Sequence, residues 1–159
     1  MNDTASSNLA VVFFEMRGLR CALPVSAVQE VLPMPNLTPV PLAPPVLRGI
    51  APVHGQILPI LDLGTCLQQT GSPSHRPDTE RLLVVETGLD GAARTVRAGL
   101  AVEAAVRVGE VDEHHSRPAP PRPAFVSATI LDAAGPALLI DAGRAMDFVR
   151  DALSAVATP

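Results

Sequence analysis

RCALPVSAVQEV (Arg20–Val31) and RAGLAVEAAVRV (Arg97–Val108) carry the architecture that we predict, because the second stretch repeats the first 77 residues later. Five of their twelve positions are identical. A second echo joins DLGTCL (Asp62–Leu67) to DAGRAM (Asp141–Met146) at an offset of 79 residues. Offsets near half of the 159-residue chain indicate a duplicated unit of roughly 75 to 80 residues.

Short apolar runs between turn signals fill both halves of the chain. Proline lacks the amide donor and fixes φ, so the proline-rich stretch Pro33–Pro45 is neither a helix nor a central strand. Many short β-branched runs are typical of small barrels or sandwiches. We predict strands at Leu9–Met16, Leu19–Val25, Gln56–Leu61, Arg81–Glu86, Thr95–Val102, Val106–Val111, Phe125–Leu131 and Ala137–Ile140.

Three helices are also predicted. Ser26 followed by Gln29 has the form of a capping box and predicts a turn or two of helix through Leu32. Asp62 is the expected N-cap of a second helix, and Asp141 of a longer C-terminal helix that ends near Val156.

The composition excludes several classes of function. The chain has no Lys, which removes the phosphate-binding loop lysine, Schiff-base catalysis and a pyridoxal anchor. A net charge of −4 and four Phe as the only aromatic residues do not favour a nucleic-acid groove. No signal peptide or membrane span is predicted, and Cys21 and Cys66 are expected to be reduced, buried thiols of a cytoplasmic protein.

His54 is the residue whose role the pattern leaves open. Val53-His54-Gly55 lies between two apolar segments and predicts a hairpin turn in which Gly55 supplies a positive φ. The other histidines, His75, His114 and His115, lie in proline-rich loops without metal-ligand spacing, so no metal site is predicted. His54 is then either an ordinary surface residue or part of a protein-contacting turn.

Four stretches, in order, resemble the CheW family, the coupling proteins of bacterial chemosensory arrays. They are LAVVFFEMRGLRCALPVSAVQEVLP (Leu9–Pro33), TPVPLAPPVLRGIAPVHGQILPILDL (Thr38–Leu63), RAGLAVEAAVRVGEV (Arg97–Val111) and RPAPPRPAFVSATILDAAGPALLIDAGRAM (Arg117–Met146). The second is similar to the family's T-x-V-P…V-x-G-V-x-N-L-R-G-x-I-x-P-V-x-D-L and is the most specific match.

The resemblance implies an all-β fold of two small five-stranded SH3-like or OB-like β-barrels, with short helices and a C-terminal helix. We expect a flexible N-terminus over residues 1–8, a CheW-like domain over 9–150 and a helix end and tail over 151–159. Within the domain, 9–78 would form the first barrel and 79–150 the second, with the option of an exchanged strand.

The resemblance also implies the function. The family is non-enzymatic, needs no cofactor or metal, and couples the cytoplasmic tips of chemoreceptors to the regulatory domain of a CheA-type histidine kinase. The chain is therefore expected in the cytoplasm, recruited to receptor arrays at the inner membrane. The alternatives are a divergent coupler of a pilus or surface-sensing system and, more weakly, an OB-like nucleic-acid-binding protein.

The residues that match the family's contact positions are expected to bind proteins. His54 replaces the arginine of the family's N-L-R-G turn, and an imidazole offers a shorter and less permanent charge than a guanidinium. This departure predicts an altered receptor contact. The predicted protein-binding residues are Val28, Glu30, Arg48, Gly49, His54, Gly55 and Val108.

Overall fold

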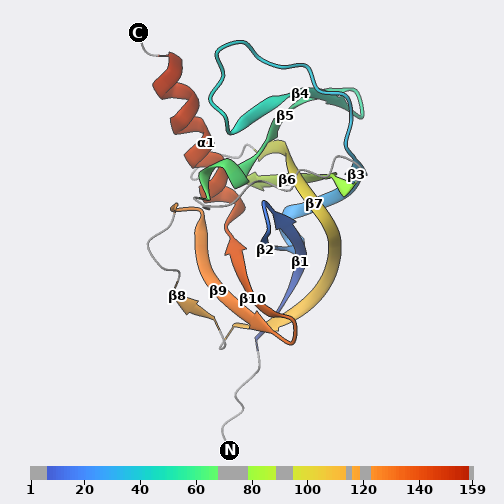
Figure 1. Cartoon of the computed structure of the whole chain (residues 1–159), viewed down its shortest axis with the longest axis vertical. Helices are drawn as coiled ribbons and strands as arrows, with labels where there is room; N and C mark the ends of the chain where they lie inside the picture. The colour runs from blue at the N-terminus through green and yellow to red at the C-terminus, as the bar shows by residue number, and fades with distance from the viewer. Residues whose placement is uncertain (1–6, 68–78, 89–94, 114–115, 119–122, 158–159) are drawn as a thin grey trace, which may run out of the picture.

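A single long strand, β7 (Thr95–Asp112), connects the two parts of the molecule (Figure 1). The structure is a computed structural model that describes residues 7–67, 79–88, 95–113, 116–118 and 123–157. The first half of β7 pairs with β6 (Arg81–Gly88) and β5 (Gln56–Leu61), and its second half pairs with β1 (Asn8–Met16). The two runs predicted as separate strands are thus one continuous strand.

The strands form two ladders that share β7. The upper ladder has the order β3 (Val28–Pro33), β6, β7, β5 and β4 (Leu47–Val53). The lower one runs from β7 through β1, β2 (Leu19–Pro24), β10 (Gly135–Ile140) and β9 (Val126–Asp132) to the short β8 (Arg117–Pro118). The all-β class is confirmed, while the ladders are open at their ends and closure into barrels stays a prediction.

The strand pairing repeats at the offsets seen in the sequence. β5 lies parallel to β7 with Ile60 beside Gly99, and β10 lies parallel to β2 with Leu139 beside Ala22. Each parallel pair therefore joins a strand of one half to a strand of the other. The predicted boundary between residues 78 and 79, and most of the predicted N-terminal segment 1–8, lie outside the described residues.

The predicted helix at Ser26 is wrong. Residues Val25–Ala27 form one 3-10 turn, η1, and the chain then enters β3, where half-buried and exposed residues alternate. Pairing with β6 through the backbone outweighs the helical propensity of this short stretch, as tertiary context commonly does.

The two predicted aspartate caps have different outcomes. Asp141 Oδ1 accepts a hydrogen bond from the Arg144 amide at 3.0 Å, at the start of α1 (Ala142–Ala157), as predicted. Asp62 precedes only a 3-10 turn, η2 (Leu63–Cys66), and its side chain makes no cap bond. Asp62 Oδ2 instead accepts a hydrogen bond from Arg17 Nη2 at 3.2 Å.

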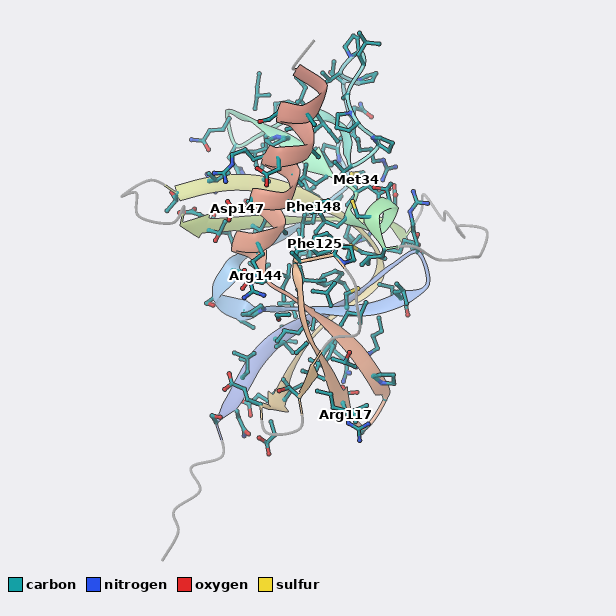
Figure 2. The ribbon with its side chains drawn as sticks, turned by 90° about the vertical axis from the view of Figure 1, so that its left-hand side faces the viewer. Met34, Arg117, Phe125, Arg144, Asp147 and Phe148 are labelled. Atoms are coloured by element: carbon teal, nitrogen blue, oxygen red, sulfur yellow. The ribbon has the colours of Figure 1, made fainter. Side chains whose placement is uncertain are left out.

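Three apolar clusters hold the elements together. One lies within the upper ladder around Ile60 and Leu82, and one within the lower ladder around Val11 and Ile130. The largest joins residues of both ladders to the apolar face of α1. Phe125 and Phe148 meet edge to face there, with ring centroids 5.2 Å apart (Figure 2), which fixes α1 against the junction.

Candidate protein-contact surface

The tip of the β4–β5 hairpin brings together two of the predicted site residues. His54 and Gly55 form a two-residue turn in which both φ angles are positive, 49° and 78°, as a type I′ hairpin turn requires. His54 Nε2 lies 2.8 Å from Glu30 Oε1 on β3, and the His54 side chain remains 63% exposed. The turn prediction is confirmed, and its histidine faces solvent beside a carboxylate from another strand.

The strand β3 presents a different apolar residue from the one predicted. Val28 is half-buried and packs against the largest apolar cluster. Val31 is 43% exposed and alternates with the half-buried Glu30 and Leu32. Had the stretch been interpreted as a strand, its period-two alternation would have indicated Val31 as an outward residue.

The base of the same hairpin holds Arg48 in a structural role. Its guanidinium donates to both carboxylate oxygens of Glu80, with Nη1–Oε1 at 2.6 Å and Nη2–Oε2 at 3.1 Å. The Glu80 side chain is only 7% exposed. The hydrogen bond to Glu80 raises the pKa of Arg48 above its ordinary value, and burial opposes this. Arg48 therefore neutralises a buried carboxylate.

Gly49 is also required by packing. A Cβ at this position would lie 2.8 Å from the carbonyl oxygen of Thr38, whose backbone pairs with Ile50. The absence of a side chain lets the loop after β3 lie directly against β4. Beside this base, a cavity of about 30 Å³ is lined by the Arg48–Glu80 and Arg17–Asp62 pairs and by Glu103.

Val108 is exposed but belongs to the lower ladder. It stands opposite Val12 in the β7–β1 pairing, and 68% of its surface is accessible. A single exposed apolar side chain is common on protein surfaces, so its exposure makes Val108 accessible to a partner without marking an interface. In the described part of the chain, Val108 lies on the lower ladder and Glu30 and His54 on the upper one, so the predicted residues do not form one cluster.

An apolar groove of about 320 Å³ lies between α1 and strands β5 and β7. None of the predicted site residues lines it. Its apolar walls are formed by Pro59, Leu61, Val96, Ala98, Met146, Val149 and Leu153.

The structure does not bring His54 and Asp62 together as an acid–base pair or a shared metal site would require. The two residues stand at opposite ends of β5, which at about 3.3 Å per residue separates them by roughly 20 Å. Across the described ranges, no three His, Cys, Asp or Glu side chains gather as a metal site would require. His75, His114 and His115 lie outside those ranges.

The cysteines have the surroundings of unreactive thiols. Cys21 is buried, and Cys66 is half-buried. Burial raises the pKa of the Cys66 thiol, which disfavours the reactive thiolate.

Among the described helices, none has both the length and the hydropathy to cross a bilayer.

Comparison with known proteins identifies the family. The model of the CheW-like domain matches residues 10–149. The chain belongs to the CheW-like domain family. The scaffolding protein TtCheW from Thermoanaerobacter tengcongensis has a similar crystal structure, with a TM-score of 0.68 and 28% sequence identity over 83% of this chain and 88% of that one. No curated protein sequence matches the chain.

Within the CheW-like frame, the predicted contact residues divide into two groups. Arg48 and Gly49 are held at the base of the hairpin by the contacts described above, and Val28 packs inward. Glu30, His54 and Val108 reach the surface, and Gly55 sets the backbone of the turn that presents His54. Val31 joins them as a residue that the sequence prediction missed.

Proposed function

We propose that this chain is a non-enzymatic adaptor that couples the cytoplasmic tips of chemoreceptors to the regulatory domain of a CheA-type histidine kinase. The observation that carries the proposal is the CheW-like domain match over residues 10–149. The scaffolding role named for TtCheW, a structure similar over most of both chains, supports it. The adaptor would act in the cytoplasm, recruited to receptor arrays at the inner membrane.

The surface residues supply polar and apolar groups for a protein contact. Glu30 and His54 offer a carboxylate beside an imidazole at the hairpin tip, and Val31 and Val108 offer exposed apolar groups on β3 and β7. Interfaces combine such apolar contacts with a polar rim. Weak individual contacts gain strength when many copies assemble in an array.

His54 favours a receptor contact that differs from the family's usual one. Where the family's turn carries an arginine, the imidazole here is paired with Glu30 and lacks the fork of N–H donors with which a guanidinium binds a partner. This supports the variant of the proposal in which the chain serves a divergent chemosensory system, such as one for pili or surface sensing.

Calorimetric titration with the regulatory domain of a CheA-type kinase from the same organism, followed by a receptor-tip fragment, tests the proposal. Val31→Asp and Val108→Asp are expected to weaken binding at least tenfold if their side chains enter the interfaces. Leu131→Asp is the matched control, because Leu131 is 42% exposed on β9. Val28→Asp is a poorer probe, since Val28 also supports the core.

Absence of binding between the wild-type chain and every such kinase of the cell would overturn the adaptor function. Kinase binding without receptor binding would retain the kinase contact and reject the receptor one. Equal loss in Leu131→Asp would show that the effect comes from general damage and not from the proposed surface.

A further inference from the structure

The hairpin tip and β3 meet at a seam that backbone hydrogen bonds do not close. β3 pairs with β6, and the β4–β5 hairpin pairs with β7 through β5. In the described part of the chain, no ladder joins β3 to this hairpin. The closeness of Glu30 to His54 therefore depends on side chains that cross the seam.

Arg97 supplies polar contacts there, beside the apolar packing of Leu32 on β3 against the cluster that contains Ala51 and Val53 of the hairpin. From β7, its Nη2 donates to Gln29 Oε1 on β3 at 2.5 Å, and its Nη1 donates to Gln56 Oε1 on β5 at 2.8 Å. Its Nε lies 3.5 Å from Glu86 Oε2 on β6, and Gln29 Nε2 also donates to that carboxylate. One planar guanidinium thus links four strands.

These contacts are adjacent to the candidate surface. Gln29 directly precedes Glu30, and Gln56 follows the His54–Gly55 turn. The register between β3 and β6 shifts between Val28 and Glu30, so Gln29 is the extra residue of a β-bulge. Bulges redirect side chains, and here the shift allows Gln29 to meet Arg97 while its neighbour Glu30 meets His54.

We propose that Arg97 is a positioning residue for the Glu30–His54 pair: it holds β3 and the hairpin tip across the open seam so that this pair is presented to a protein partner. The part concerning the partner rests on the proposed function. A fixed fork of donors is essential because it must satisfy Gln29 and Gln56 in two directions at once. The ammonium of a lysine is a point charge on a flexible stem and does not reproduce this geometry.

A double-mutant cycle on the pair tests the positioning without any partner. The wild type, Glu30→Gln, His54→Gln and the double variant are unfolded in urea under one set of buffer conditions. In the wild-type background we expect a coupling of about two- to fivefold in the unfolding equilibrium constant, the range of an exposed ion pair. In the Arg97→Lys background the coupling should vanish.

Arg107→Ala is the matched control. Arg107 lies on the same strand and pairs with Asp132 at 3.3 Å. It stands opposite Phe13 in the lower ladder, whereas the seam lies in the upper one, so its loss should leave the coupling intact. A merely structural role of Arg97 would lower the stability of all four proteins and leave the coupling unchanged. That result, or a wild-type chain without coupling, would overturn the proposal.

Two further measurements keep the test decisive. If Arg97→Lys does not fold, Gln29→Ala and Gln56→Ala remove its two acceptors singly, and each should reduce the coupling. Affinity for the kinase regulatory domain and the receptor tip is then measured for Arg97→Lys, with at least a fivefold loss expected for the partner that uses the pair. If Arg97→Lys abolishes the coupling but the wild-type chain binds neither partner, the positioning role is retained and the adaptor function is rejected. If the wild-type chain binds its partners but the coupling persists in Arg97→Lys, the adaptor function is retained and the positioning role is rejected.

Discussion

The β4–β5 hairpin pairs a basic residue with a carboxylate at each end, and the two pairs differ in burial and geometry. At the base, Arg48 holds the nearly buried Glu80 through two hydrogen bonds. At the tip, His54 meets Glu30 through one nitrogen and stays 63% exposed. Buried pairs are costly to break and exposed pairs contribute little to stability. The base therefore belongs to the fold, while the tip is available for recognition.

The largest effect is expected at the base. Arg48→Ala leaves the Glu80 carboxylate buried without its bidentate partner, so stability should fall by about 3 kcal/mol. Urea unfolding followed by circular dichroism measures the loss. The double variant Arg48→Met/Glu80→Leu should regain much of it, because a hydrophobic pair of similar size needs no compensation. A loss below about 1 kcal/mol for Arg48→Ala would place the base pair in the same class as the tip.

The two glycines of the hairpin sharpen the same comparison. Gly49→Ala would place a Cβ 2.8 Å from the Thr38 carbonyl oxygen, and such overpacking costs about 1 to 3 kcal/mol. Gly55→Ala meets no atom within 4 Å but must adopt a φ of 78°, which costs about 1 kcal/mol. In thermal unfolding, Gly49→Ala should therefore have a lower melting temperature than Gly55→Ala. Gly55→Asn should be nearly neutral, since asparagine tolerates this conformation. If Gly55→Asn lowers the melting temperature as much as Gly55→Ala, a requirement other than the positive φ of the turn would be responsible.

A third ion pair, in the lower ladder, allows the comparison to be made by pH. Hydrogen bonds from Arg20 lower the pKa of Asp132 to about 2, from an ordinary value of 3.8. The folded state therefore binds this proton less readily, so the pair stabilises the fold above about pH 4 and loses its contribution between pH 4 and 2. The loss should be on the order of 1 kcal/mol, since the pair is partly exposed.

The control for this pH dependence is Asp132→Asn. Its stability should be lower than that of the wild type at pH 5, and the two should converge near pH 2. A difference that remains constant down to pH 2 would mean that the carboxylate charge is not what stabilises the lower ladder.

The sequence predicted the parts of this hairpin that depend on local chemistry. β5 has the predicted bounds, and the turn at His54 and Gly55 follows from the local demand for positive φ. β4 was not predicted, because Pro52 and the prolines before it discourage a strand assignment, although an edge strand tolerates proline. The local pattern of β3 predicts a helix, because the pairing of β3 with β6 joins residues 48 to 57 positions apart, which no local pattern contains.

The candidate site shows the same division. Family resemblance indicated Arg48 and His54 alike, and neither residue's neighbours in the sequence distinguish their roles. The distinction comes from Glu80, 32 residues from Arg48, and from Glu30 on another strand. Arg97 was missed altogether, because its three partners lie on three different strands and leave no motif in the sequence.

The smallest stability effect is expected at the tip, where the functional effect should be largest. His54→Gln removes one exposed side-chain pair and should lower stability by less than about 1 kcal/mol. The same substitution should weaken binding to whichever partner contacts the hairpin tip, since a desolvated charge contributes far more at an interface than on a free surface. Urea unfolding and calorimetric titration on one preparation measure both quantities. His54→Arg restores a permanent charge and should bind receptor tips at least as well as the wild type. If His54→Gln instead lowers stability as much as Arg48→Ala and leaves binding unchanged, then the tip and the base serve the same structural purpose.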